Sequence, residues 1–150
     1  MKNMRFNRLV PELSALDIKK SLGFYKKLGF KIEYQRKEDK FAFLSFQGSQ
    51  IMIQELRKNA DSNDKKSVWY TGELKHPFGR GLHFQMEVKD VTALFNKINK
   101  SKYPIKAPLT DTWFRQDKFL LGMRYFLIMD PDGYLILFHQ DIGKKKANSK

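Results

Sequence analysis

The sequence predicts an α+β fold built from two βαβββ modules in tandem. First, two apolar runs flank Asp130-Pro131-Asp132-Gly133, an arrangement typical of a β-hairpin because glycine adopts the positive φ that closes such turns. Second, a weaker copy occurs earlier, where residues 41–46 and 50–54 flank a turn at Gln47-Gly48-Ser49. Third, a strand pattern and an amphipathic helix pattern precede each hairpin, so the second half repeats the plan of the first.

The first module covers residues 6–57. Alternation over residues 9–15 predicts a strand with Leu9, Leu13 and Ala15 on its buried face. A helix is expected over residues 18–28, because Asp17 is a good N-cap and Gly29 is a typical helix stop. Its expected apolar stripe is Ile18, Leu22, Tyr25 and Leu28. A strand over residues 30–36 and the hairpin of residues 41–56 complete the module.

A polar connector is predicted over residues 58–80, with Trp69 and Tyr70 packing on the body of the protein. The second module covers residues 81–141. Its first strand has Leu82, Phe84, Met86 and Val88 on one face and His83, Gln85 and Glu87 on the other. Asp90 is the expected N-cap of a helix with the apolar stripe Val91, Leu94, Phe95 and Ile98.

The two modules differ in length. Asp17 and Asp90 are 73 residues apart, whereas Gly48 and Gly133 are 85 apart. We place the additional 12 residues in a long loop over residues 107–121. A short strand near residues 103–106 precedes this loop, and a strand over residues 123–129 follows it.

Composition limits the classes of protein to consider. A chain of 150 residues that is 41% hydrophobic is long enough for one domain with a core, which we place at residues 1–142. The absence of cysteine excludes disulfides, thiolate metal ligands and a cysteine nucleophile. No apolar run reaches membrane-spanning length, and no signal-peptide pattern is present. We therefore expect a cytoplasmic protein with no membrane partner.

The chain is strongly basic, with a net charge of +13. Four of its lysines lie in residues 143–150, which we predict to be a basic, disordered tail, and the rest of the chain then carries +9. Nucleic acid or another polyanion therefore stays open as a partner.

Two runs resemble the vicinal-oxygen-chelate superfamily of glyoxalase I, extradiol dioxygenases, fosfomycin-resistance enzymes and bleomycin-resistance proteins. They are Asp17-Ile-Lys-Lys-Ser-Leu-Gly-Phe-Tyr-Lys-Lys-Leu-Gly-Phe30 and Gly122-Met-Arg-Tyr-Phe-Leu-Ile-Met-Asp-Pro-Asp-Gly133. The second is similar to the bleomycin-resistance branch, where Gly-x-Arg-x-Phe precedes this turn. The resemblance implies a curved mixed sheet that encloses a cavity, and a homodimer with a groove between subunits. Leu121 departs from that branch, which often has tryptophan there.

The resemblance also implies where a metal would bind. In the enzymatic members the ligands lie at positions that correspond here to Val10, Met52, His83 and Leu137. Zinc, iron or manganese sites of this kind need three or four nitrogen or oxygen ligands, and only His83 offers one. The metal-dependent reactions are therefore disfavoured, and we assign no metal, no cofactor and no catalytic residue. His83 is expected to be a hydrogen-bonded wall residue.

Strand alternation and the resemblance together give the expected ligand-binding residues. They are Glu12, Met52, Gln54, His83, Gln85, Glu87, Trp113, Arg124, Leu137 and His139. Glu12 and Glu87 either lie at a wet rim or meet a cation. Arg124 either contacts the ligand or pairs with a carboxylate that holds the inserted loop. Trp113, with its neighbour Phe114, either stacks on a flat ligand or packs in a dimer.

Three functions stay open. The first is a metal-free protein that sequesters a small molecule, with antibiotics among the candidates, in a dimer groove. The second is a metal-dependent lyase, transferase or dioxygenase of the superfamily whose reduced or relocated metal site lies around His83, with His139 and Glu12. The third is a nucleic-acid-associated module, which is not favoured because no nucleic-acid motif is present. The charge of +13 opposes a cationic drug such as bleomycin and favours an anionic ligand, although Glu12 and Glu87 act against this locally.

Overall fold

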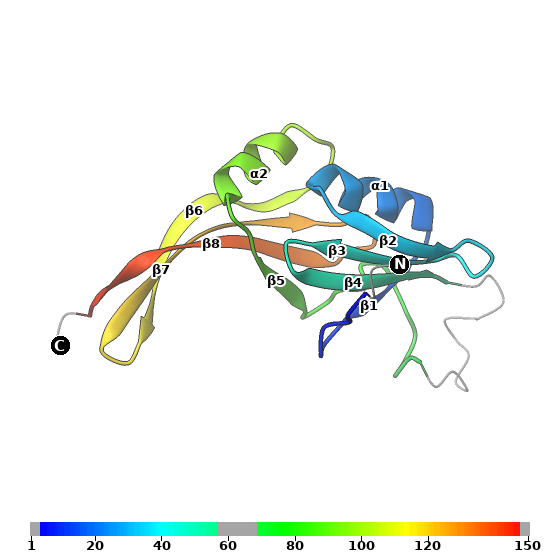
Figure 1. Cartoon of the computed structure of the whole chain (residues 1–150), viewed down its shortest axis with the longest axis horizontal. Helices are drawn as coiled ribbons and strands as arrows, with labels where there is room; N and C mark the ends of the chain where they lie inside the picture. Colours follow the sequence, from blue (N-terminus) through cyan, green and yellow to red (C-terminus); the bar gives the residue numbers. More distant parts are fainter. Residues whose placement is uncertain (1–3, 57–68, 148–150) are drawn as a thin grey trace. The chain divides into compact units, whose positions relative to one another are not determined.

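The computed structural model describes residues 4–56 and 69–147. The chain divides into two compact units: residues 1–80 with 131–133, and residues 81–130 with 134–150. Among the described residues, each unit has one helix and one four-stranded mixed sheet, so the prediction of two βαβββ modules is confirmed (Figure 1). No helix in the described residues is both long and apolar enough to span a membrane.

The first unit carries the βαβββ plan in residues 12–55. Its elements are β1 (Glu12–Ala15), α1 (Ile18–Leu28), β2 (Lys31–Arg36), β3 (Phe41–Phe46) and β4 (Ser49–Glu55). The strand order is β1-β4-β3-β2; β1 pairs with β4 in parallel and the other pairs are antiparallel. Phe46 pairs with Ser49 across a two-residue turn whose φ angles are 46° at Gln47 and 89° at Gly48. The expected glycine hairpin is therefore confirmed. Positive φ angles at both turn residues give a turn whose twist matches that of the flanking strands.

Helix α1 has the expected ends. The Asp17 carboxylate accepts hydrogen bonds from the amides of Lys19 at 2.9 Å and Lys20 at 3.2 Å. Gly29 ends the helix in the left-handed region, with φ 107°. Both residues satisfy backbone groups that a helix end leaves unpaired.

The buried face of α1 differs from the expected stripe. It consists of Ser21, Phe24, Tyr25 and Leu28. Ile18 and Leu22 are only half-buried. The reason is the buried Asp132 carboxylate, which accepts a hydrogen bond of 2.6 Å from the Ser21 hydroxyl and so stabilises Ser21 on the inner face.

Strand β1 is shorter than the alternation predicted. Leu13 and Ala15 are buried as expected, but Leu9 is 84% exposed and precedes the strand. Pro11 lies between them and has no amide hydrogen to continue a ladder. Its carbonyl accepts from the amide of Met52 at 2.8 Å, at the point where pairing with β4 begins.

The second unit repeats the order of elements. They are β5 (His83–Glu87), α2 (Val91–Ile98), β6 (Ile105–Gln116), β7 (Phe119–Met129) and β8 (Leu135–Lys146). The sheet order is β5-β8-β7-β6. Asp90 caps α2 as expected, accepting from the amide of Ala93 at 2.8 Å. Val91, Leu94 and Ile98 are buried, and Phe95 contacts Phe126 edge to face at 5.3 Å between ring centroids.

The prediction of a long loop over residues 107–121 is wrong. These residues extend β6 and β7 into one hairpin, which pairs as far as Gln116 and Phe119 and turns at Asp117, with φ 51°. Lengthening two paired strands keeps the backbone groups of the added residues hydrogen-bonded, which a structureless loop would not. In Figure 1 the three strands β6, β7 and β8 run side by side beyond α2.

The prediction of a disordered tail over residues 143–150 is also wrong for residues 143–146. Gly143 to Lys146 belong to β8 and pair with Gly122 to Phe119 of β7. The extension of β7 supplies the pairing edge, and the lysine side chains stay exposed on the strand. Residues 148–150 lie outside the described residues.

The polar connector predicted over residues 58–80 is only partly described, because residues 57–68 lie outside the described residues. Trp69, expected to pack on the body, is 83% exposed, whereas Tyr70 is half-buried. Near its end, the Phe78 amide donates to the Asp132 carbonyl at 2.9 Å.

The Asp-Pro-Asp-Gly turn has a second role besides connecting β7 and β8. The Asp130 carboxylate accepts from the Tyr134 amide at 2.8 Å, and this bond closes the turn. The Asp132 carboxylate accepts from the Leu16 amide at 2.8 Å, in addition to the Ser21 hydroxyl. Residues 131–133 therefore belong to the first unit, where they fix the start of α1.

Candidate functional site

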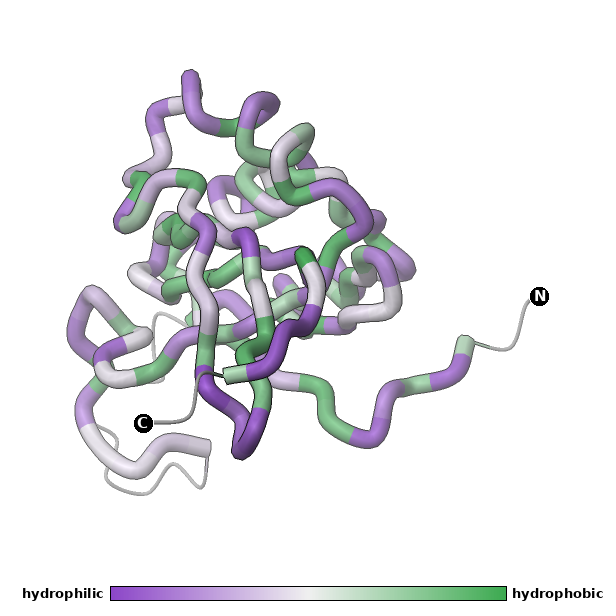
Figure 2. Tube along the Cα trace, turned by 90° about the vertical axis from the view of Figure 1, so that its left-hand side faces the viewer, coloured by the Kyte–Doolittle hydropathy of each residue, from purple (hydrophilic) through white to green (hydrophobic). Residues whose placement is uncertain are grey.

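The sheet of the second unit has one face covered by α2. Gln140 accepts from the Val91 amide at the start of α2 at 3.2 Å, and Phe126 contacts Phe95, so both lie on this covered face. Strand alternation places the other set of side chains on the opposite face, which we call the open face of the second sheet. It carries His83, Gln85, Glu87, Leu135, Leu137 and His139, with Tyr125 and Leu127 from β7. Figure 2 shows that hydrophilic and hydrophobic residues are mixed along the whole chain trace.

The open face contains a cavity of about 290 Å³. It is lined by Glu87, Phe114, Leu121, Gly122, Met123, His139 and Asp141. Register explains why they meet: Glu87 pairs with His139, Met123 with Asp141, and Phe114 with Leu121. An apolar cavity with a few polar groups is the usual form of a small-molecule site.

The charged groups of this cavity are two carboxylates. Glu87 and Asp141 are both exposed, so water stabilises their charge and no buried partner is required. The Asp141 carboxylate also accepts from the Gly143 amide at 2.7 Å, which fixes its position. With Phe114, Leu121 and Met123 beside them, these acids suit a ligand that has a cationic group and an apolar body.

Arg124 makes the carboxylate pair that was one of its two expected roles. Its guanidinium donates to both oxygens of Asp111, at 2.7 and 2.8 Å, and joins β7 to β6. The bond to Arg124 holds the pKa of Asp111 below its usual value, and Asp111 raises the pKa of Arg124. Arg124 alternates in phase with Phe126, so it lies on the covered face and away from the cavity.

Trp113 lies on the same face as Arg124, because it pairs with Gly122, two residues before Arg124. A Cβ atom at Gly122 would lie 2.8 Å from both the Trp113 ring and the Ile142 side chain. The glycine of the Gly-x-Arg-x-Phe run is thus required by the ring that packs on it. Lys145 covers the same ring at 3.9 Å. Of the two neighbouring aromatic residues, Phe114 lines the cavity and Trp113 does not.

The first unit holds three predicted site residues on the face of its sheet opposite α1. Glu12 and Met52 are pairing partners on β1 and β4, and Glu12 is exposed. The Gln54 amide donates to the carbonyls of Asp39 at 2.7 Å and Glu55 at 3.0 Å, so it holds the turn between β2 and β3. On the same face, Phe43 is covered by Tyr34 and Phe6, with ring centroids 5.5 and 4.9 Å away.

Sequence comparison decides the family. A model of the glyoxalase/bleomycin resistance protein/dioxygenase superfamily matches residues 5–138. The chain belongs to this superfamily.

Curated members of the superfamily and solved structures agree with this assignment. Bleomycin resistance proteins of Geobacillus stearothermophilus and Staphylococcus aureus are each 32% identical over 137 residues, which is 89% of this chain and 96% of theirs. TioX from Micromonospora sp. ML1 has the same fold, with a TM-score of 0.64, 19% identity, and coverage of 91% of this chain and 100% of that one. A superfamily structure from Alicyclobacillus acidocaldarius gives a TM-score of 0.60 at 21% identity, covering 93% and 96%.

The superfamily's metal positions do not fit a metal in this member. Val10 and Met52 belong to the first unit, and His83 and Leu137 to the second, where Leu137 pairs with Gln85. Only His83 can donate a ligand nitrogen, and it is exposed at the start of β5. Within residues 4–56 and 69–147, no three His, Asp or Glu side chains are close enough to hold a metal ion.

The predicted site residues thus fall into three groups in this member of the superfamily. Glu12, Met52 and Gln54 belong to the first unit. His83, Gln85, Glu87, Leu137 and His139 share the open face of the second sheet, and Glu87 and His139 also line its cavity. Trp113 and Arg124 lie on the covered face. Phe114, Leu121, Met123 and Asp141 are cavity residues outside the predicted set. Alternation within β6 and β7 would have indicated Phe114, Leu121 and Met123, but only once the inserted residues were identified as strands.

Proposed function

We propose that this protein is a metal-free binding protein of the bleomycin-resistance type, which sequesters an amphiphilic small molecule without transforming it. The relatives that are 32% identical are named bleomycin resistance proteins, and this supports an antibiotic as the ligand class. The side chains at the four superfamily metal positions supply a single ligand nitrogen, which disfavours a metal-dependent reaction.

The cavity on the open face of the second sheet is the observation that carries this proposal. It combines three apolar side chains, Phe114, Leu121 and Met123, with the carboxylates of Glu87 and Asp141. Its volume of about 290 Å³ is at the lower end of the range for small-molecule sites. A ligand with an apolar ring and a cationic or hydrogen-bond-donating group would contact both the apolar side chains and the carboxylates.

Net charge and local charge act in opposite directions on such a ligand. The +13 charge of the chain repels a cation at long range, but salt screens this beyond about 10 Å. Glu87 and Asp141 act at contact distance, where the Coulomb energy is largest. The net charge therefore opposes the binding of a cationic ligand, and the two carboxylates offset this repulsion only for a ligand that fits the cavity.

A thermal-shift screen with bleomycin-like drugs, other antibiotics and divalent metals tests the proposal. A ligand at 100 times its dissociation constant stabilises the folded protein by about 2.7 kcal/mol, which is a measurable shift in melting temperature. Glu87→Gln should reduce the shift of a cationic hit, whereas the matched Asp117→Asn, at an exposed carboxylate in the turn between β6 and β7 outside the cavity, should leave it unchanged. Equal effects of the two substitutions would place the ligand elsewhere.

Bleomycin itself is expected to give little or no shift, because the net charge opposes a cationic drug. A large bleomycin shift that Glu87→Gln abolishes would show that the local carboxylates outweigh the net charge.

We also propose that the protein is a homodimer, with its ligand groove between the subunits. Phe114 and Phe119 on the extended hairpin are 46% and 38% exposed, which is typical of aromatic residues that pack against a partner. Sedimentation analysis should give twice the chain mass of 17.8 kDa, and Phe114→Ser should shift the equilibrium toward the monomer.

A further inference from the structure

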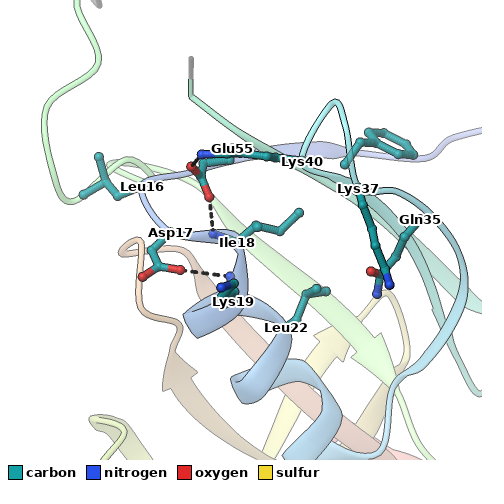
Figure 3. A pocket seen from close by; sticks show the side chains of 10 residues that line it. Leu16, Asp17, Ile18, Lys19, Leu22, Gln35, Lys37, Lys40 and Glu55 are labelled. Atoms are coloured by element: carbon teal, nitrogen blue, oxygen red, sulfur yellow. Dashed lines mark hydrogen bonds and ion pairs between the residues drawn. The ribbon is translucent and has the colours of Figure 1, made fainter. Parts of the chain in front are cut away.

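A second cavity lies in the first unit, at the start of α1. Its volume is about 660 Å³. Its walls come from α1 with the residues before it, from the segment that joins β2 to β3, and from the end of β4. Figure 3 shows Ile18 and Leu22 projecting from the helix on one side, and Gln35 and Lys37 on the opposite side. None of these four residues was predicted to line a site.

The apolar part of this cavity is a second stripe of α1. Ile18 and Leu22 are one helical turn apart, so they lie on the same side of the helix. Both were expected in the core, but the bond of Ser21 to Asp132 stabilises a different buried face. Together with the exposed Leu16 they give the cavity an apolar surface that the folded core does not use.

The polar part of the cavity contains two carboxylates, those of Glu55 and Asp17. Glu55 accepts from the Ile18 amide at 3.0 Å and forms an ion pair with Lys40. The bond from Lys40 is the main reason that the pKa of Glu55 lies below its usual value. The next two amides of α1, those of Lys19 and Lys20, donate to Asp17. The helix start is therefore already capped and offers no spare amide to a ligand.

Two cations of the cavity lack an acidic partner in the part of the chain that the structure describes. Lys19 and Lys37 line the cavity and form no ion pair within the described residues. Lys37 lies beside the amide of Gln35, so a charged donor and a neutral donor face the apolar stripe of α1 (Figure 3). This combination is complementary to an anion that carries an apolar chain.

We propose that this cavity binds an amphiphilic carboxylate, such as a medium-chain fatty acid. The carboxylate accepts from Lys37 and Gln35, and the chain lies on Ile18 and Leu22. Lys19 adds to the positive potential at the opening. The net charge of +13 opposes a cationic ligand but favours the approach of an anionic carboxylate. The site lies in the first unit and uses none of the residues of the cavity in the second unit.

Calorimetric titration with octanoate and with octylammonium, which have similar chains and opposite charges, tests this proposal. Octanoate should bind at least about tenfold more tightly than octylammonium. Lys37→Gln should weaken octanoate binding roughly tenfold, which corresponds to one charge-assisted hydrogen bond. The matched control is Lys27→Gln, because Lys27 is an exposed lysine of α1 outside the cavity, and the control should change affinity by less than about twofold.

Methyl NMR spectra locate the ligand on the full chain. Octanoate should shift the methyl resonances of Ile18 and Leu22 and leave those of Ile98, a buried residue of the second unit, unchanged. Glu87→Gln should have no effect on octanoate affinity, which separates this site from the proposed antibiotic site. Any one of three results would overturn the proposal. They are equal affinity for octanoate and octylammonium, an equal loss of octanoate affinity in Lys37→Gln and Lys27→Gln, and unshifted methyl resonances of Ile18 and Leu22.

Discussion

Gly133 and Asp132 show how single residues fix the most informative motif of the sequence. Gly133 has φ 88°, and a Cβ atom there would lie 2.2 Å from the Cβ atom of Pro77. The glycine is thus required both by backbone conformation and by close packing. Asp132, next to it, is buried and accepts from the Leu16 amide and the Ser21 hydroxyl. A motif that sequence analysis interprets as a turn therefore also positions the first helix.

Substitution of two glycines by alanine should have opposite effects on stability. Gly133→Ala should lower the free energy of unfolding by about 2 kcal/mol or more, because it adds strain at positive φ and a clash. Gly23→Ala is the control, since Gly23 lies inside α1 with nothing within 4 Å of an added Cβ. It should raise the free energy of unfolding by about 0.5–1 kcal/mol. Urea denaturation measures both, and a neutral Gly133→Ala would contradict the packing against Pro77.

At the scale of elements, the sequence predicted features that depend on neighbouring residues better than features that depend on residues far apart in the chain. The boundaries of α1 follow from Asp17 and Gly29, which act within a few residues, and they were predicted correctly. The buried face of α1 depends on Ser21 meeting Asp132, which is 111 residues away, so local periodicity misplaced Ile18 and Leu22. Long-range contacts decide which of two apolar stripes is buried.

The extended strands of the second unit illustrate the same limit. Residues 107–121 and 143–146 contain glycine, proline and many charged residues, which favoured loops. They are strands because β6, β7 and β8 pair with one another over their full lengths, and that pairing is not visible in any one segment. The error carried over to the site: the register of β6 and β7 places Phe114, Leu121 and Met123 in the cavity and Trp113 on the other face.

The cap of α1 should contribute measurably to stability. Asp17→Ala should lower the free energy of unfolding by about 1 kcal/mol, because two amides of the first turn lose their acceptor. Glu38→Ala removes an exposed carboxylate from a turn and should change stability by less than about 0.5 kcal/mol. The two variants lose the same charge, so equal effects in urea denaturation would contradict a capping role.

At the scale of the whole molecule, the duplicated plan has produced two units with different surfaces. Both have the same order of elements and the same strand order. The first unit carries a cavity with lysines beside the apolar stripe of α1, and the second carries a cavity with carboxylates on its open face. Hydrophobic residues occupy three of the four positions at which the resemblance implies metal ligands.

Acid should destabilise the protein through carboxylates that are paired when it is folded. Lys40 lowers the pKa of Glu55, Arg124 that of Asp111, and Lys31 with Ser45 that of Glu33. Their contribution is complete above the ordinary carboxyl pKa of about 4 and is lost as the pH falls through the lower folded values. The urea midpoint should fall between about pH 5 and pH 2. Glu55→Gln with Asp111→Asn should make this dependence weaker, and an unchanged pH profile would contradict the assignment.

The metal content of the purified full chain, measured by inductively coupled plasma mass spectrometry, tests the central claim most directly. We expect well below one equivalent of zinc, iron, manganese or nickel per chain, including after incubation with each metal and desalting. His83→Ala should not change these values. One tightly held equivalent that disappears in His83→Ala would contradict a protein that only binds its ligand and would instead support a metal-dependent enzyme.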